Sequence, residues 1–290
     1  MQTLLNFEGI RSLIILKSDI CSSYPLKLLR MKKEKIIPAI HNYCDRWCER
    51  CVFIERCAVG LEELKRWNRD TPMTEDEMWA AVSDNFKESL RMLDEMLEEA
   101  GIDPAELEIQ PVPVFDSDLD KLEMEIFEKG MIYFKLSNAF FNGNQAFLQE
   151  QEAEVKRMTE MNLPIDLDQL GQIQDALEVI QQYASFIGVK ARRAISGMKE
   201  MHDTAIWGDP PYQSDANGSA KSCLLCIDRS LSAWEMLRKI WPEKTDEILD
   251  LLVALSRFRK ELAALFPDWE KFVRPGFDTE PMQVRRFEMN

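Results

Sequence analysis

Hydrophobic side chains recur at steps of three and four residues along most of the chain after residue 74, as they do on one face of an α-helix. The clearest stripe follows Asp166 and runs from Leu170 to Met198. Shorter stripes cover residues 78–97, 122–140, 147–161, 223–234 and 248–265. The sequence has no series of alternating hydrophobic and polar residues, so it does not predict strands. The pattern predicts an all-α fold, an up-down bundle of five to six long helices.

Start and stop signals bound these helical stretches. Thr74 followed by Glu77 forms a capping box, and Gly101 supplies a stop. The sequence Asn142-Gly143-Asn144 predicts a break between two helices. Prolines end three other stretches: Pro164, Pro242 and Pro267.

Three regions follow one another along the chain. Residues 1–30 mix a short apolar run, Leu13–Leu16, with charged residues, and we expect a leader or upstream extension that is poorly ordered. The alternative is an N-terminal helix that packs on the bundle. Residues 31–70 form a cysteine-rich module, and residues 71–290 form the bundle. Because roughly forty residues cannot build a core of their own, we expect the module to dock on the bundle.

Four cysteines lie within fourteen residues of the module: Cys44, Cys48, Cys51 and Cys57. Their spacings of x3, x2 and x5 allow all four thiolates to converge on one soft metal centre. A helix over residues 38–51 would place the first three on one face, within about 60° of one another, with His41 on the same face. Cys57 would lie nearly opposite, so it joins the others only if the chain turns after Cys51.

An iron-sulfur cluster of the four-iron type is the favoured cofactor. Three thiolates within eight residues suit irons that lie close together better than they suit the two separated pairs of a zinc finger. Tetrahedral Zn²⁺, bound by three or four cysteines with or without His41, is the alternative. In the third interpretation, reduced cysteines pack as small apolar residues.

Two resemblances involve the same residues. The spacing Cys44-x3-Cys48-x2-Cys51 is similar to that of radical S-adenosylmethionine enzymes. Those enzymes resemble partial or full α/β barrels, whereas nothing in this sequence alternates strand with helix, and a nearby fourth cysteine would fill the open iron. The segment His41-Asn-Tyr-Cys-Asp-Arg-Trp-Cys-Glu-Arg-Cys51, with the later Asp228-Arg229-Ser230, resembles a bacterial family of helical proteins. That similarity runs from about Met31 into the last helices and implies no particular activity.

Charge and composition narrow the function classes. A net charge of −15 argues against binding to nucleic acid or to anionic membranes, which need basic surfaces. The sequence has no run of about 18 apolar residues, so it does not predict a membrane-spanning helix. Seven cysteines, an odd number, without an export signal indicate a reducing compartment, so we expect a cytoplasmic protein. A protein partner is compatible with these features, and the oligomeric state stays open.

Other candidate sites are weaker. Cys223 and Cys226 form a Cys-x2-Cys pair, but their apolar neighbours favour core packing. The loop from Ser214 to Lys221 has the elements of a small-anion site, and ordinary helix capping explains it equally well. Charged residues on the predicted helices, such as Arg193 and Asp228, would line an interior pocket if these two met between helices. More often, such residues lie on faces exposed to solvent. His202 lies near a predicted helix end.

The sequence therefore predicts a metal-binding cytoplasmic helical protein with a redox or sensing role. The alternative is a zinc-stapled structural or interaction scaffold without catalysis. A third hypothesis is an enzyme that uses a cavity of the bundle, with the metal as a structural clip. No catalytic residue is identified, because the chain has only two histidines and offers neither a hydrolase triad nor a di-iron motif.

Overall fold

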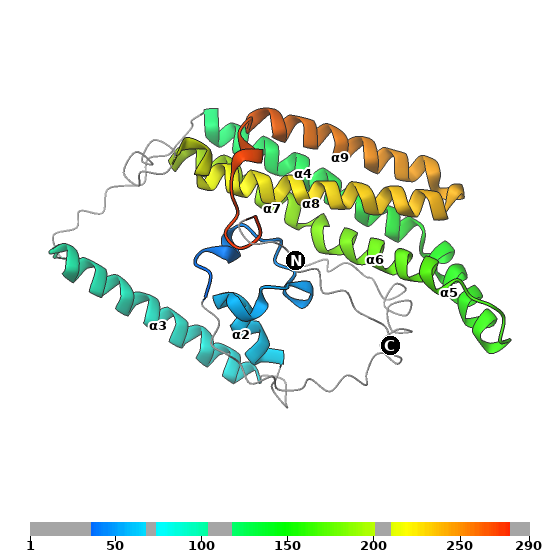
Figure 1. Ribbon diagram of the computed structural model, residues 1–290, viewed down its shortest axis with the longest axis horizontal. Helices are drawn as coiled ribbons and strands as arrows, with labels where there is room; N and C mark the ends of the chain where they lie inside the picture. The colour runs from blue at the N-terminus through cyan, green and yellow to red at the C-terminus, as the bar shows by residue number, and fades with distance from the viewer. Residues whose placement is uncertain (1–35, 68–73, 104–117, 201–209, 279–290) are drawn as a thin grey trace. The chain divides into compact units, whose positions relative to one another are not determined.

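The computed structural model describes residues 36–67, 74–103, 118–200 and 210–278. Within these ranges every regular element is a helix and there is no strand, which confirms the all-α prediction. The α-helices, shown in Figure 1, are α2 (Ala58–Trp67), α3 (Glu75–Ala100), α4 (Asp118–Gly143), α5 (Gln145–Glu160), α6 (Leu167–Ala184), α7 (Phe186–Glu200), α8 (Asp215–Ile240) and α9 (Thr245–Leu265). None of the described helices is both long and apolar enough to cross a membrane.

Contacts divide the chain into two compact units. One holds Met1–Gly60 together with Ser117–Asn290, and the other holds Leu61–Asp116. The boundary predicted from the sequence lies between residues 70 and 71 instead. The difference arises because the cysteine-rich residues contact the bundle through many side chains, whereas α3 belongs to the second unit. The expected leader, residues 1–30, lies outside the described residues.

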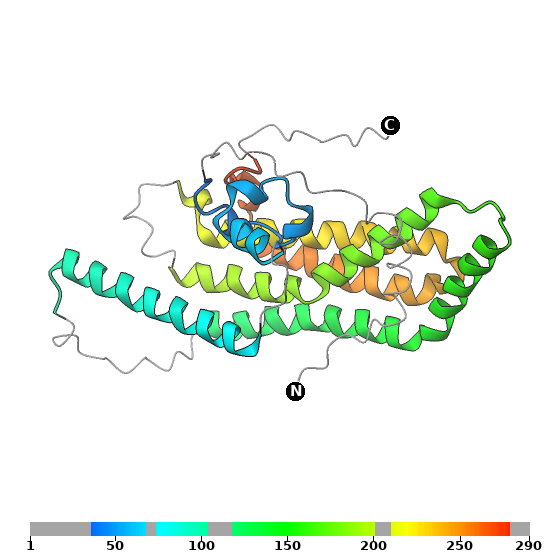
Figure 2. The same ribbon diagram turned by 90° about the horizontal axis from the view of Figure 1, so that it is seen from below.

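Helix α8 is the central element of the first unit, packed against α6, α7 and α9, while α4 packs against α7 and α9. These helices run side by side in both ribbon views (Figures 1 and 2). Their shared core is formed by apolar side chains from every one of them, and Leu224, Ile227 and Trp234 of α8 are completely buried. The 3.6-residue periodicity of the sequence therefore marks this core correctly.

Two helix breaks were tested by the structure. The predicted break at Asn142–Asn144 is confirmed, because α4 ends at Gly143 and the Asn144 side chain donates to the carbonyl of Phe140, at 2.8 Å. The single helix expected over residues 170–198 is wrong, because Ser185 separates α6 from α7. Tyr183 and Ile187 on either side of this break are both fully buried. A break that keeps the same face buried leaves no trace in the hydrophobic spacing.

Helices α4 and α7 approach each other closely at two glycines. A Cβ atom added to Gly130 would overlap the Cα atom of Gly188. Neither glycine has a positive φ, so their role here is close backbone approach. Together with α8, this contact positions the face of α7 that meets the cysteine segment.

Candidate metal centre

The cysteine segment consists of three short 3₁₀ turns: Ile40–Asn42, Cys48–Arg50 and Ile54–Arg56. The α-helix considered over residues 38–51 is therefore wrong. Ala39 and Arg46 have φ angles of 58° and 57°, in the left-handed region, which no α-helix contains. The last turn supplies the change of direction that Cys57 needs to join the other cysteines.

All five predicted ligands nevertheless line one small pocket: His41, Cys44, Cys48, Cys51 and Cys57. The other lining residues include the apolar Ile40, Ile54 and Phe277 and the charged Asp45 and Arg46. The cavity is about 20 Å³, which accommodates one water-sized group. In the described part of the chain, no group of three or more His, Cys, Asp or Glu side chains is already arranged to hold a metal ion. The five donor side chains therefore line the same pocket, but they do not surround a single metal position.

Backbone N–H groups point at two of the sulfurs. The amide of Arg46 donates to Cys44 Sγ at 3.4 Å, and the amide of Phe53 donates to the thiol of Cys51. In both cases the donor lies two residues after the cysteine. Such hydrogen bonds favour the thiolate, which is the form that binds metals. This feature fits the donor set to a soft metal.

Burial acts on the candidate ligands in the opposite direction. It raises the pKa of the Cys44 and Cys51 thiols, so both are protonated at neutral pH when no cation is present. Burial and nearby cations, including Arg46, lower the pKa of His41, so its ring is neutral and has a free lone pair. A bound metal ion would displace the thiol protons, as metal binding to cysteine generally does.

Asp45 anchors the segment to the bundle. Its carboxylate accepts a hydrogen bond from the Tyr183 hydroxyl at 2.7 Å and an ion-paired hydrogen bond from Arg229. The carbonyl of Asp45 accepts from the Gln182 side chain at 3.3 Å. Arg229 also donates to the Tyr183 hydroxyl, at 2.7 Å. The residue that directly follows Cys44 is thereby fixed to both α6 and α8.

Backbone carbonyls provide further anchors. The Lys190 amine donates to the carbonyl of Asn42 at 2.6 Å, and the Ser222 hydroxyl donates to that of Tyr43 at 2.7 Å. The Tyr43 ring packs on Phe272, with ring centroids 4.7 Å apart, and both rings lie over Gly218. A Cβ atom at Gly218 would come within 2.5 Å of each ring.

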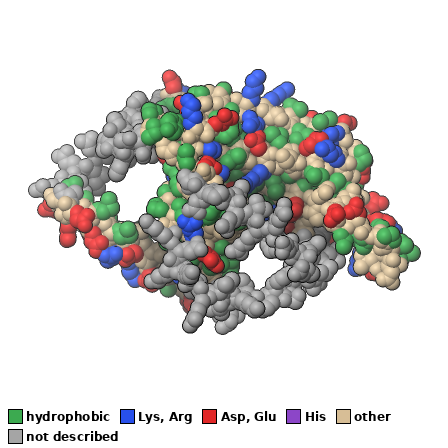
Figure 3. Space-filling view, in the orientation of Figure 1, with side chains coloured by type: hydrophobic (Ala, Val, Ile, Leu, Met, Phe, Trp, Pro, Cys, Tyr) green, Lys and Arg blue, Asp and Glu red, His purple; other side chains and the backbone are tan. Residues whose placement is uncertain are grey.

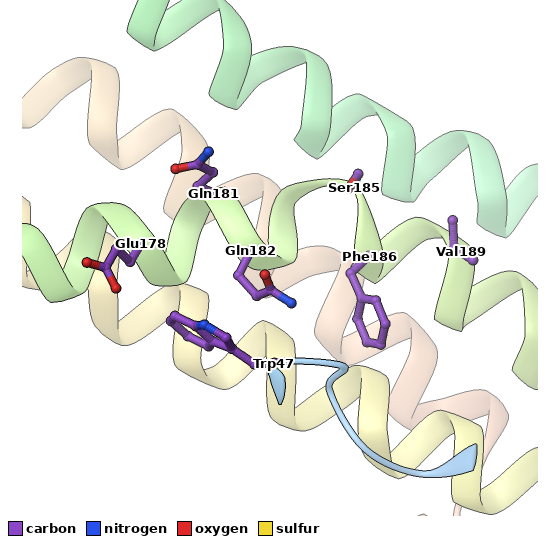
Figure 4. Close-up of a pocket in the computed structure, with 7 residues that line it drawn as sticks. All are labelled: Trp47, Glu178, Gln181, Gln182, Ser185, Phe186 and Val189. Carbon is purple, nitrogen blue, oxygen red and sulfur yellow. The ribbon is translucent and has the colours of Figure 1, made fainter. Parts of the chain in front are cut away.

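A groove of about 570 Å³ lies beside the cysteine segment. Figure 4 shows the rings of Trp47 and Phe186 on one side of α6 and α7, with Gln182 between them. The edge of the Trp47 ring meets Tyr183, and the Arg50 guanidinium lies 4.3 Å from the centroid of the Trp47 ring. Trp47 therefore separates this groove from the pocket of the cysteines, since it lines both.

The roles of Asp45 and Tyr183 are not evident from the sequence pattern. Tyr183 lies on a buried hydrophobic stripe, where only its hydroxyl distinguishes it from a core residue. Two signals were present: Asp228-Arg229-Ser230, whose arginine pairs with Asp45, and Lys190, a lysine between the buried Ile187 and Ala191. A lysine at a buried position needs an acceptor, which is here the Asn42 carbonyl.

The remaining candidate residues in the described part of the chain pack in the core or form ion pairs. Cys223 and Cys226 are buried in the core, as favoured, and Cys223 Sγ donates to the carbonyl of Ile187. Arg193 and Asp228 do not meet, because Arg193 pairs with Asp215 and Asp228 pairs with Arg259. His202 lies outside the described residues.

The anion loop is replaced by helix. Ser214 caps α8 by accepting from the amide of Asn217, so residues 215–221 are already helical. Lys221 donates to the carbonyls of Glu270 and Phe272 and pairs with Asp278. Its amine thus holds the C-terminal segment, whose Phe277 packs edge-on against Phe53 of the cysteine segment.

Comparison with known proteins gives no relative: no family model, curated protein or solved structure matches the chain.

Proposed function

We propose that the cysteine segment, residues 36–60, holds an iron-sulfur cluster through Cys44, Cys48, Cys51 and Cys57, and that the protein serves electron transfer or redox sensing. The observation that supports this most directly is the convergence of all four cysteines on one largely apolar pocket. Helical packing alone does not require four thiols at the same place. A cluster bound there would supply one-electron redox chemistry.

Two cations near the thiols would partly offset the negative charge of a metal-thiolate centre. Four thiolates leave a net negative charge on either a cubane cluster or a zinc ion, and nearby cations offset it. Burial and the Asp45 carboxylate raise the pKa of Cys44, while the charges of Arg46 and Lys190 lower it, and the net direction is upward. Hydrogen bonds to sulfur and exclusion of water are the features by which proteins set the potential of a cluster.

Zinc is the second candidate, and one observation favours it. The cavity of about 20 Å³ suits a single ion better than a four-iron cubane, which requires the side chains to move outward. With zinc, the segment would be a staple for an interaction scaffold, and no redox role would follow. The resemblance to a bacterial helical family adds no activity to either proposal.

Metal analysis of protein purified without oxygen distinguishes the two candidates. An iron-sulfur protein would be brown, with broad visible absorbance and iron and sulfide in equal amounts, and reduction with dithionite would bleach it. A zinc protein would be colourless and would contain about one zinc per chain. Protein that retains neither metal, although folded by circular dichroism, would contradict both candidates.

A further inference from the structure

Helix α3 presents an apolar face to solvent. Trp79, Phe86, Leu90 and Leu93 are 61%, 67%, 47% and 50% exposed. Figure 3 shows hydrophobic and acidic side chains together on the surface of this helix. Amphipathic helices gain most of their stability by burying such a face, so an exposed face of this length indicates a binding surface.

Local signals mark both ends of α3. Thr74 and Glu77 form the predicted capping box, and Gly101 ends the helix in the left-handed conformation, with φ of 67°. Arg91 pairs with both Glu88 and Glu95 along the outer face. At 26 residues, α3 is about 39 Å long, enough for three heptads of a coiled coil.

The apolar face follows a heptad pattern. Trp79, Phe86 and Leu93 recur every seven residues and take the d positions, while Leu90 and Leu97 take the a positions. Val82 and Met96 fall at g positions and widen the face. Ser83 is the one polar residue at an a position between Trp79 and Leu97. This arrangement is typical of a helix that packs against another helix along a seam.

Charges beside the seam specify the orientation of the second helix. Among the e positions of α3, Lys87 and Asp94 carry opposite charges one heptad apart. In an antiparallel pair, e positions face e positions, so Lys87 of each helix meets Asp94 of the other. The same alignment places Leu90 against Leu93 and Phe86 against Leu97. A parallel pair would instead place Lys87 beside Val82 and Asp94 beside Ser89, without an ion pair.

We infer that α3 pairs with the α3 helix of a second copy of this chain, as an antiparallel coiled coil. The self-complementary charges at Lys87 and Asp94 support this occupant over an unrelated partner. Most acidic residues of α3, such as Glu88 and Glu95, lie on the outer face, where two paired helices keep them apart. Antiparallel packing also places the helix dipoles favourably.

Sedimentation equilibrium of the full chain over a range of concentrations tests the inference. We expect a dimer, and Leu90→Glu should weaken dimerisation by about 100-fold or more, because it buries a charge in the seam. Met92→Glu is the matched control: Met92 is 54% exposed and lies about 160° around the helix from Leu90, so its substitution should leave the dimer intact. A wild-type monomer at all concentrations, or equal effects of both substitutions, would overturn the inference.

Charge reversal tests the antiparallel register. Lys87→Glu and Asp94→Lys should each weaken dimerisation about tenfold, because two attractive contacts become repulsive. The double variant should restore the wild-type affinity, since the charges are then exchanged but still complementary. A double variant as weak as the single variants would overturn the register. The loss of the exposed Lys87–Asp84 pair within α3 is common to both Lys87 variants and does not explain a rescue.

Discussion

Asp45 is the residue at which the cysteine segment and the helical bundle meet. Its carboxylate binds Tyr183 of α6 and Arg229 of α8, while its neighbour Cys44 lines the pocket of the thiols. Groups that hydrogen-bond to metal ligands, or to their neighbours, and so orient them contribute substantially to metal affinity in known sites. The Asp45 contacts therefore make the bundle the support of the candidate metal centre.

Substitution of Arg229 tests this support. Arg229→Gln removes the ion pair to Asp45 and should lower metal affinity about 10-fold or more, with a loss of about 1 kcal/mol in the free energy of unfolding because the arginine is half exposed. Competition with a chelator measures the affinity, and denaturant unfolding measures the stability. Arg259→Gln is the matched control. It breaks an ion pair with Asp228, which lies on α8 as Arg229 does but does not line the pocket of the cysteines. Equal metal affinity in both variants would argue against a supporting role for Asp45.

The cysteine spacing predicts which side chains lie together, but not their geometry. The spacing of the cysteines predicted that they and His41 share a site, and all five line one pocket. The helical face proposed for them is wrong, because Ala39 and Arg46 adopt positive φ. These conformations place Asn42, Tyr43 and Asp45 against partners more than 130 residues away. No local pattern contains such distant contacts.

At the scale of elements, the helices follow closely from hydrophobic spacing and capping residues. The cap at Thr74 and the break at Asn144 lie where the sequence predicts them. The division between α6 and α7 was missed, because the same stripe continues across Ser185. Local signals thus define helix ends where a polar cap or glycine marks them, and fail where the core face simply continues.

The close approach of α4 and α7 gives a prediction at this scale. Gly130→Ala should lower the free energy of unfolding by about 1–3 kcal/mol, because the new methyl group overlaps the backbone at Gly188. Gly171→Ala in α6 is the matched control, since a Cβ atom there meets nothing within 4 Å. That substitution should raise the stability by up to about 1 kcal/mol through helix propensity. Thermal or urea unfolding of both variants checks the difference in sign, and a stabilised Gly130→Ala variant would contradict the close packing.

At the scale of the whole molecule, the division into units could not be predicted from the sequence. Helix α3 has the same amphipathic pattern as the bundle helices, so periodicity assigned it to the bundle. Contacts place it in a separate unit, while residues up to Gly60 join the bundle. An apolar stripe indicates that one face of a helix is suited to burial, but it does not indicate which surface covers that face. Here that ambiguity leads to the inferred pairing of α3 with a second copy.

The central claim is that the four clustered cysteines bind a metal centre, and one measurement tests it most directly. Wild-type protein and Cys48→Ser are purified without oxygen, and their iron, sulfide and zinc contents are determined. Cys223→Ser is the control, because Cys223 is buried in the core, where a serine hydroxyl can keep the hydrogen bond to Ile187. We predict that Cys48→Ser loses the metal and unfolds at a lower temperature, while Cys223→Ser retains the metal. Unchanged metal content in Cys48→Ser would contradict both the iron-sulfur proposal and its zinc alternative.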